Sequence, residues 1–454
     1  MKVIIIILQA ILNLVRKRRD LIANRSKIPP EYRDNVVVWY SPKKQRLTNY
    51  DVIERYAEDF TYWTINNTSI TSAQKKIVIP AGTELEYVIA YRGFNSSTDG
   101  FDIKYTGNAV IIYKYNKEDG TEDNITINKS GIYHLPASVR TQKNFGFYCN
   151  PQTVTEETTI EQLPTSILKD FSGNELDAYM YGFQGKLNSG VGIYAVDFTT
   201  YRKTSVVTDV SHNTVKVVPA ASNYLFIRYA TTEMPAYTVN VQNLGNNVLT
   251  YQYATENGRR EITLTEGINE IPESIKVDNP YQVGLRVNAG TGEITITQIP
   301  DYPNSLCYAG KQYCKAYGLP ILNDYTIIAR RTWFDKTGVR CFCSKYKDST
   351  VAGLFRFEWV AGNKEYTSSL GKDTNVVFVD SNITWQTKTS YNGKALTNLQ
   401  YEDGEHLIIA NRYEGEYNTY IGCHDDIIIF KRSLTINEIN DITEAIFNET
   451  IIEE

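Results

Sequence analysis

Hydrophobic positions at the start of the chain follow the period of an α-helix. Residues 3–15 are apolar except at two polar positions, and four basic residues, 16–19, come directly after them. Side chains three and four residues apart share one face of a helix, and Pro29 and Pro30 would end it. The pattern therefore predicts an anchoring or oligomerisation helix and linker over residues 1–30. Its expected contact residues are Ile4, Leu8, Ile11, Leu12, Val15, Arg16 and Arg18.

The apolar face of this predicted helix is too wide for an isolated surface helix. It predicts burial against copies of the chain, as a dimer or trimer, or in a groove of another protein. Insertion into a membrane surface is the alternative. The apolar run 3–15 is too short to cross a bilayer, and its basic run follows it instead of preceding it as in a secretory signal. We therefore expect no membrane span.

Beyond residue 30 the pattern changes to the two-residue alternation of half-buried β-strands, broken by Gly, Asn and Pro turns. Two stretches, 71–164 and 210–300, resemble each other. Similar blocks recur 136 to 139 residues apart, beginning at Lys76 and Val215, Tyr113 and Tyr251, Gly131 and Gly267, and Thr159 and Thr295. Duplication of one small antiparallel β-sandwich explains this recurrence. We expect one strand order in both modules, with Tyr113 equivalent to Tyr251.

The C-terminal part contains a strand that runs into a helix. Residues 427–430 are apolar, and Ser433 or Thr435 is placed to cap a helix, with Glu438 in the capping-box position. This segment, 424–439, resembles the closing segment of the laminin-G-like (LamG), concanavalin A-like β-sandwich. Six further motifs resemble the same family in the right order: Val36–Pro42, Leu168–Ala178, Leu306–Tyr313, Tyr325–Trp333, Tyr391–Lys394 and Leu407–Arg412.

The resemblance implies a mainly β fold in which a LamG β-sandwich is interrupted by the two smaller sandwich modules and preceded by the N-terminal α-helix. The LamG segments would be 36–49, 166–200 and 306–446. Val38 would then pack in the same core as Ile328 or Ile428. The combination of motifs is similar to LamG-like structural and fibre proteins of phages and prophages of gut bacteria.

Composition supports a β-rich chain and excludes some classes of function. Tyrosine, which favours pleated surfaces, occurs 34 times in 454 residues. The net charge of −5 provides no basic field for nucleic acid. The six cysteines have no paired C-x-x-C spacing, so we expect no zinc site. Reduced, buried thiols are expected, with a disulfide framework as the alternative.

No catalytic residue, metal site or cofactor is predicted. Glycoside hydrolysis needs two carboxylates placed on either side of the scissile bond, but Glu358 stands alone among aromatic residues. The adjacent Asp425 and Asp426 are expected on opposite faces of a strand. LamG-like domains can hold calcium, but the acids of the family's F-D-G-x-D-D-Y motif are replaced here by Ala309, Lys311 and Gln312.

Aromatic side chains in an exposed loop are the expected means of binding a sugar. Tyr413, Tyr417 and Tyr420 lie in or beside a polar, Gly- and Asn-containing segment and are our predicted glycan contacts. We therefore expect a non-enzymatic fibre or decoration protein of a virion head or tail, assembled in the host cytoplasm. Its helix would bind capsid or tail proteins, and its LamG-like domain would attach to the host surface. A bacterial surface glycan-binding or adhesion protein is the alternative, and a glycan hydrolase is the third possibility.

Overall fold

The computed structural model describes residues 28–447 with short exceptions, and for the strands between 355 and 392 it describes the backbone alone. The predicted N-terminal helix therefore lies outside the described residues, apart from the end of its linker. The exceptions within 28–447 are 49–51, 186–187, 220–223, 229–232, 278–282, 289, 321, 323, 346–354, 361–363, 370–372, 381–385, 393–405 and 413–418.

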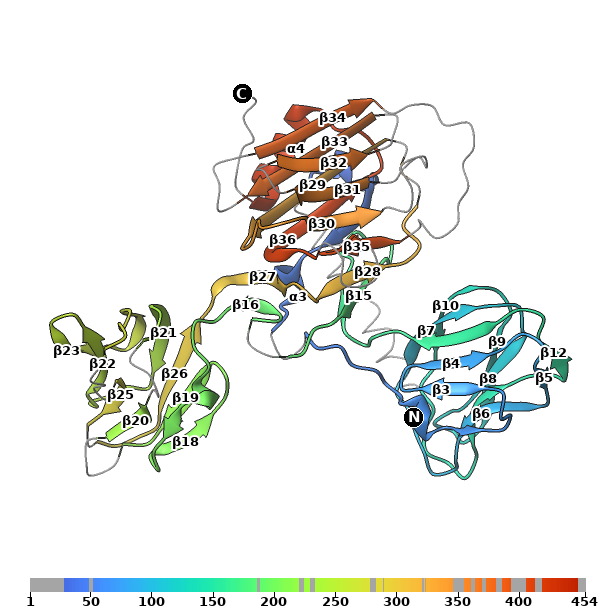
Figure 1. Cartoon of the computed structure of the whole chain (residues 1–454), viewed down its shortest axis with the longest axis horizontal. Helices are drawn as coiled ribbons and strands as arrows, with labels where there is room; N and C mark the ends of the chain where they lie inside the picture. The colour runs from blue at the N-terminus through green and yellow to red at the C-terminus, as the bar shows by residue number, and fades with distance from the viewer. Residues whose placement is uncertain are drawn as a thin grey trace, which may run out of the picture.

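The chain is mainly β, as predicted, and its strands form three sandwiches (Figure 1). We call the largest the main sandwich; it consists of two seven-stranded sheets. Its first sheet has the order β16 (Val191–Ile193), β27 (Asp301–Ala309), β36 (Ile421–Phe430), β29 (Asp324–Trp333), β33 (Asp373–Asp380) and β34 (Gln386–Asn392), with β1 (Val36–Tyr40) also paired to β36. Its second sheet has the order β14 (Ile167–Leu168), β15 (Ala178–Tyr181), β28 (Tyr313–Ala316), β35 (Leu407–Ile409), β30 (Arg340–Lys345), β31 (Phe355–Val360) and β32 (Lys364–Ser369).

The core of the main sandwich joins residues that are far apart in the sequence. Strand β1 pairs antiparallel with the end of β36, and Val38 lies between the two sheets with Ile327 and Ile429. The expectation that Val38 packs with Ile328 or Ile428 was wrong, because these two face the other side of the sheet. Successive side chains of a strand point to opposite faces, so an error of one position moves a residue out of the core.

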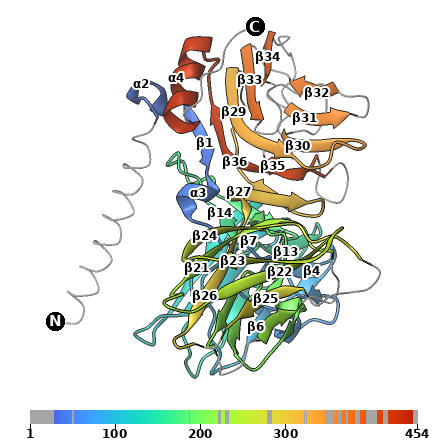
Figure 2. The same cartoon turned by 90° about the vertical axis from the view of Figure 1, so that its left-hand side faces the viewer.

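The outer face of the first sheet is covered by helix α4 (Ile436–Phe447). The predicted capping box is present, because Glu438 accepts a 2.7 Å hydrogen bond from the Thr435 amide, and the Thr435 hydroxyl accepts one of 3.4 Å from the Glu438 amide. Arg432 also donates to Glu438 at 2.7 Å. Figure 2 shows α4 beside β1 and the short helices α2 (Pro30–Arg33) and α3 (Pro42–Gln45).

Two smaller sandwiches, copy 1 and copy 2, are inserted into the main sandwich. One sheet of copy 1 has the order β10 (Gly131–Leu135), β7 (Phe101–Thr106), β13 (Thr158–Gln162), β4 (Lys76–Ile79) and β3 (Thr71–Ala73). The other has the order β2 (Thr64–Ile65), β6 (Val88–Arg92), β11 (Phe145–Tyr148), β8 (Ile111–Asn116) and β9 (Glu122–Ile127), and a separate pair is formed by β5 (Glu84–Leu85) and β12 (Gln152–Thr153).

Copy 2 repeats the two five-stranded sheets of copy 1 strand for strand. One sheet has the order β24 (Gly267–Ile271), β21 (Tyr237–Gln242), β26 (Ile294–Ile299), β19 (Thr214–Val217) and β18 (Val207–Val210). The other has the order β17 (Arg202–Lys203), β20 (Tyr224–Arg228), β25 (Gly284–Val287), β22 (Leu249–Thr255) and β23 (Gly258–Leu264). Tyr113 on β8 and Tyr251 on β22 are both fully buried. Each stacks on the tyrosine two residues later, with centroids 6.0 and 5.8 Å apart.

Both copies begin earlier in the sequence than predicted. A 3₁₀ turn, η1 (Phe60–Tyr62), precedes β2, and its counterpart η2 (Phe198–Thr200) precedes β17. Phe60 is buried in the core of copy 1 and Phe198 in the core of copy 2. The end of the predicted LamG segment 166–200 thus belongs to copy 2, whereas β27 begins at Asp301, before the predicted start of the last LamG segment.

The two copies are joined to the main sandwich in different ways, although both lie at the same end of it (Figures 1 and 2). Copy 1 is docked through an apolar patch in which Leu163 packs against Tyr179 and Tyr181. The Tyr179 hydroxyl also donates a 2.9 Å hydrogen bond to Asp102 of copy 1. Copy 2 is instead continuous with the first sheet, because β26 passes into β27 with only Pro300 between them.

Candidate functional site

The structure contradicts one of the three predicted glycan contacts. Tyr420 is fully buried, with 0% of its surface exposed. Its ring packs against Trp333 and Phe342, with centroid distances of 4.7 and 5.2 Å, and its hydroxyl donates to backbone carbonyls at 2.7 and 2.8 Å. A side chain enclosed in this way is part of the core and cannot reach a ligand. The other two predicted contacts, Tyr413 and Tyr417, lie outside the described residues.

The residues predicted to attach the protein to its partner also lie outside the described residues, so their role stays a prediction. They are Ile4, Leu8, Ile11, Leu12, Val15, Arg16 and Arg18. Within the described ranges, no group of three or more His, Cys, Asp or Glu side chains is placed to hold a metal ion. The helices of that same part are all too short or too polar to cross a membrane.

A polar pocket of about 240 Å³ opens where β27 enters the main sandwich from copy 2. We call it the β27 pocket. It lies over three neighbouring strands, β27, β36 and β29, which the sheet brings together from distant parts of the sequence. Its lining residues are Tyr302, Pro303, Asn304, Ser305, Arg330, Arg331, Thr332, Cys423 and Asp425.

The charged groups in the β27 pocket are paired with each other. Asp425 accepts a hydrogen bond from the Ser305 hydroxyl, and its other carboxylate oxygen lies 3.6 Å from Nε of Arg330. The side chains of Arg330 and Asp425 remain 28% and 32% exposed, so both can exchange water for a ligand. Arg331 contributes no free charge to the opening, because its guanidinium lies over the ring of Phe342 at 5.2 Å and the residue is 1% exposed.

An aromatic pair stands at the β27 pocket. The rings of Tyr302 and Phe334 have centroids 5.2 Å apart and are inclined at 40°, and Phe334 is 38% exposed. Tyr302 has a φ of +53°, which is the left-handed region that a bulky side chain rarely adopts. Such strain costs on the order of 1–3 kcal/mol and is concentrated at functional sites. The backbone therefore holds this ring at the pocket at some cost to stability.

A β-bulge places Asp425 and Asp426 differently from the prediction. Ala329 pairs with Ile427, but Arg331 pairs with His424, so the two aspartates together oppose the single residue between Ala329 and Arg331. A bulge interrupts the alternation of faces on which the prediction rested. Both carboxylates consequently make contacts on the side of the sheet that α4 covers, and the expected divergence to opposite faces was wrong.

The second aspartate of the bulge is nevertheless separated from the pocket. Asp426 is 6% exposed and accepts a 2.7 Å hydrogen bond from the indole of Trp39. Burial raises the pKa of Asp426, while the hydrogen bonds from Trp39 and Ser41 act in the opposite direction. It is absent from the residues that line the pocket. The pocket thus presents one carboxylate, Asp425, and the acid–base pair that glycoside hydrolysis requires is not formed there.

Two further reactive side-chain types lie close to the pocket but are buried. His424 is fully buried against the Tyr308 hydroxyl, 3.0 Å from its Nε2, and burial lowers the pKa of His424 to about 3. Cys307 and Cys423 are direct cross-strand neighbours, and burial raises the pKa of the Cys307 thiol. As predicted, all six cysteines are buried and free. The buried imidazole and thiols in these positions serve packing and hydrogen bonding.

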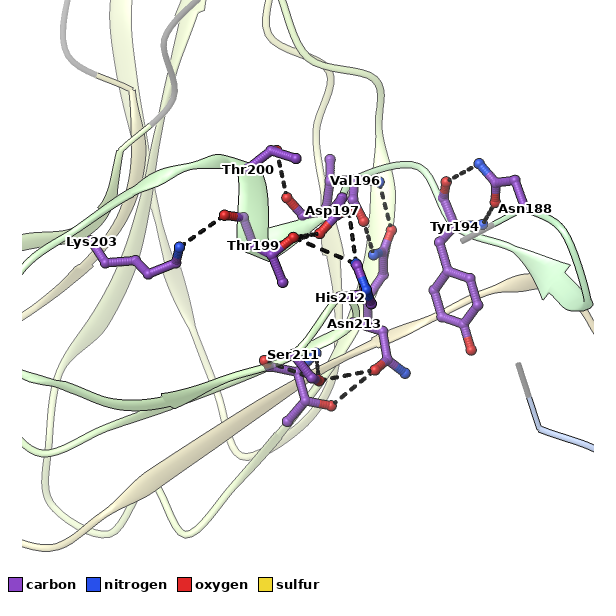
Figure 3. A network of polar contacts seen from close by, with 12 residues as sticks. Asn188, Tyr194, Val196, Asp197, Thr199, Thr200, Lys203, Ser211, His212 and Asn213 are labelled. Atoms are coloured by element: carbon purple, nitrogen blue, oxygen red, sulfur yellow. Dashed lines mark hydrogen bonds and ion pairs between the residues drawn. The ribbon is translucent and has the colours of Figure 1, made fainter. Parts of the chain in front are cut away.

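A second polar network lies at the start of copy 2 (Figure 3). Asp197 caps η2 by accepting from the Thr199 amide at 2.8 Å, and it lies 2.9 Å from Nδ1 of His212. Burial raises the pKa of Asp197, but hydrogen bonds from Thr199 and His212 outweigh burial and lower it overall. The Lys203 ammonium donates to the Thr199 carbonyl at 2.9 Å. The groups in this network bind one another and hold the turn in place.

Copy 1 shows that this second network is structural. Its cap residue, Asp59, accepts from the Thr61 amide at 2.9 Å, as Asp197 does from Thr199. The Phe60 amide donates to the carbonyl of Gln74 at 2.9 Å, and the Phe198 amide donates to that of His212 at the same distance. Gln74 of copy 1 therefore corresponds to His212 of copy 2. The turn of copy 1 forms without an Asp–His pair.

The pocket could not have been found from local sequence patterns. Ser305, Arg330 and Asp425 come from three strands and are separated by 25 and 95 positions in the sequence. Of these, only Asp425 was considered individually from the sequence, as an acid expected to point away from its neighbour Asp426. The sequence did, by contrast, contain a repeated motif that marks the first turn of each copy. Asp-Phe-Thr occurs at 59–61 and again at 197–199, at the same spacing of 138 as Tyr113 and Tyr251.

Comparisons with known proteins place the chain in no family. No family model matches it, and no curated protein matches it. Solved structures give weak likenesses: Bacillus subtilis oxalate decarboxylase (8% identity, TM-score 0.14, covering 55% of this chain and 78% of that one), the PBSX exported protein XepA (8%, 0.15, 54% and 97%), and the Lactobacillus farciminis oxalate decarboxylase formate complex (8%, 0.14, 57% and 89%). At these TM-scores the likenesses carry no information about function.

Proposed function

We propose that this chain is a non-enzymatic fibre or decoration protein of a virion, attached to the head or tail through its N-terminal helix. The observation that supports this best is the architecture: a main sandwich built from three sequence segments that carries two copies of one small sandwich at one end. Repeated sandwiches extend a protein outward and present surface without building an enclosed site. In this proposal the main sandwich is LamG-like and attaches to the host surface.

The proposal that the protein is not an enzyme is supported by the chemistry of the β27 pocket. Its one lining carboxylate is paired with Arg330 and bonded to Ser305. Neither His424 nor Asp426 lines it. General acid–base catalysis needs a titrating group within hydrogen-bonding reach of the substrate, and His424 and Asp426 are both buried away from the pocket. The pocket is therefore better suited to holding a ligand than to cleaving one.

A bacterial surface protein that binds glycans is the second candidate function, and the β27 pocket favours it equally. The two candidates differ in where the protein is found and in the role of residues 1–25. A virion protein copurifies with particles assembled in the host cytoplasm, at a fixed ratio to capsid or tail proteins. A bacterial surface protein is recovered with the cell envelope when no particles are present.

The test is deletion of residues 1–25 in the genome that encodes the protein, followed by quantitative mass spectrometry of purified particles. We expect the full chain in particles and the truncated chain in the lysate as a soluble, folded protein, because the three sandwiches have separate cores. Burying the four side chains of one apolar stripe is worth about 6–12 kcal/mol before ordering costs. Normal incorporation of the truncated protein would refute attachment through this helix.

A control alters a surface segment elsewhere in the chain. Replacing the exposed turn 117–121 of copy 1 with Asn-Gly should leave incorporation unchanged, because that turn connects β8 and β9 away from the docking patch. Light scattering of the full and truncated chains then distinguishes a dimer or trimer from a monomer. Absence of the full chain from purified particles would contradict the virion assignment and favour the bacterial surface protein.

A further inference from the structure

We infer that the β27 pocket binds one neutral pyranose unit of a surface saccharide. This names a ligand class for the surface attachment proposed above and rests on that proposal only for the biological source of the sugar. The predicted tyrosines do not carry this inference, since Tyr420 is buried. The inference follows instead from the size of the pocket, its hydrogen-bonding groups, its aromatic pair and its balance of charge.

The size of the pocket suits a single sugar ring. Its volume is about 240 Å³, which lies just below the range of about 300–1,000 Å³ typical of pockets for larger ligands. It lies over the strands β27, β36 and β29, so its base is held by paired backbone. A longer saccharide would therefore place one unit in the pocket and leave the rest on the surface.

The polar groups of the pocket match the hydroxyls of a sugar. Asp425 accepts hydrogen bonds, and Arg330 donates them, from positions 3.6 Å apart. Ser305, Asn304 and Thr332 add hydroxyl and amide groups that both donate and accept. Neighbouring sugar hydroxyls also both donate and accept, so a carboxylate beside a guanidinium can bind two of them at once. A purely apolar ligand would leave these groups without partners and would bind poorly.

The aromatic pair provides the face on which a ring can stack. Tyr302 lines the pocket, and Phe334 supports its ring from a centroid distance of 5.2 Å. The C–H groups of a pyranose favour contact with the negative face of an aromatic ring. The positive φ of Tyr302, +53°, is unfavourable for a bulky side chain such as tyrosine. A glycine would relieve the backbone there, so the presence of tyrosine is best explained by a use for its ring.

The balance of charge favours a neutral sugar over an acidic one. Arg330 and Asp425 neutralise each other, and the guanidinium of Arg331 is directed over Phe342. A sialic or uronic acid would have to displace Asp425 from Arg330 and place its own carboxylate beside it. Like charges at such a distance repel, so acidic sugars should bind more weakly than neutral ones.

The experiment uses the purified full chain on an array of neutral and acidic oligosaccharides, followed by saturation-transfer NMR with each glycan that binds. We expect binding to at least one neutral glycan, and a loss of at least tenfold in affinity in Asp425→Asn. Arg259→Gln, which removes an exposed arginine from copy 2, is the matched control and should bind normally. Binding to acidic glycans alone, binding unaltered in Asp425→Asn, or no binding to any glycan would overturn the inference.

Tyr302→Gly separates a binding role from a structural one. It removes the ring and relieves the positive φ, so we expect lost binding with a thermal midpoint equal to or above that of the unaltered protein. A lower midpoint together with normal binding would show that Tyr302 is only structural and would contradict the site. The outcome is independent of particle incorporation: a virion protein that binds no glycan would refute this pocket alone, and a glycan-binding protein absent from virions would refute the virion assignment alone.

Discussion

Tyr420 illustrates how a single residue can be misjudged from its neighbours in the sequence. It follows a polar segment, and that context suggested exposure. Two residues later, Gly422 carried a contrary signal, because a Cβ at that position would lie 2.5 Å from the Tyr420 ring and 2.2 Å from the Thr332 carbonyl oxygen. Glycine at a strand interior often marks such a close approach, but the approaching group is known only from the fold.

The first prediction concerns this residue. Tyr420→Ala should lower the free energy of unfolding by about 3–5 kcal/mol, because a large ring is removed from between Trp333 and Phe342. Tyr420→Phe keeps the ring and loses the hydroxyl's hydrogen bonds to the backbone, which should cost only about 1–2 kcal/mol. Chemical denaturation measures both. Equal effects of the two changes would show that packing of the ring is not the main contribution.

At the scale of elements, the sequence predicted what local rules determine. The apolar run 427–430 is part of β36, and the Thr435–Glu438 box begins α4 where expected. The extension of β36 back to Ile421 was not predicted, nor was the bulge at Asp425 and Asp426. A bulge depends on the register with the neighbouring strand, β29, which no local pattern specifies.

The second prediction concerns the start of α4. Hydrogen bonding to Arg432 lowers the pKa of Glu438 to about 2, whereas an unfolded glutamate titrates near pH 4.3. The folded state therefore binds fewer protons in this window, so the contribution of Glu438 is fully present above about pH 4.3 and is lost as pH falls towards 2. After allowance for solvent screening it should amount to about 1–2 kcal/mol.

Thermal unfolding between pH 7 and pH 2.5 measures this contribution. Glu438→Gln should be less stable than the unaltered protein at pH 7 and should differ from it less at pH 2.5. Glu444→Gln, at an exposed position of the same helix, should leave the pH dependence unchanged. A constant difference between Glu438→Gln and the unaltered protein at every pH would contradict the proposed role of the carboxylate.

At the scale of the molecule, the duplication was readable from the sequence because conserved spacing survives where individual residues change. The boundaries of the two copies could not be predicted from the sequence, because the first turn of each copy lies in a short stretch that resembles a linker. The sequence also contained no sign that the copies are attached differently. Leu163 of copy 1 packs against Tyr179 and Tyr181 of the main sandwich, and local sequence patterns do not predict a contact between two separate sandwiches.

The third prediction follows from these attachments. Ile193 and Asp301 are cross-strand neighbours, so residues 194–300 can be replaced by the hairpin turn Asn-Gly. The remaining protein should stay soluble, with the main sandwich folded. Replacing 56–164 in the same way is also geometrically possible, since the Thr165 amide donates to the Arg55 carbonyl at 2.8 Å. That deletion exposes the apolar patch around Tyr179 and Tyr181 that copy 1 covers, and we expect the product to self-associate.

Circular dichroism and size-exclusion chromatography distinguish the two deletions. If both products were monomeric and equally stable, the surface around Tyr179 and Tyr181 would tolerate exposure to water, and the prediction of self-association would be wrong. If deletion of 194–300 unfolded the rest, the core of copy 2 would be part of the core of the main sandwich, contrary to their separate clusters of buried residues.

The direct passage from β26 through Pro300 into β27 has a mechanical consequence. A pull on copy 2 enters the main sandwich along β27, whose pairs with β36, from Leu306 opposite His424 to Ala309 opposite Ile421, lie side by side across the direction of the force. Bonds loaded in this way share the force and must break together, whereas bonds at a peeled edge break one at a time. Copy 2 and the first sheet are thus connected as one tether, and the β27 pocket lies at the point where the tension would enter.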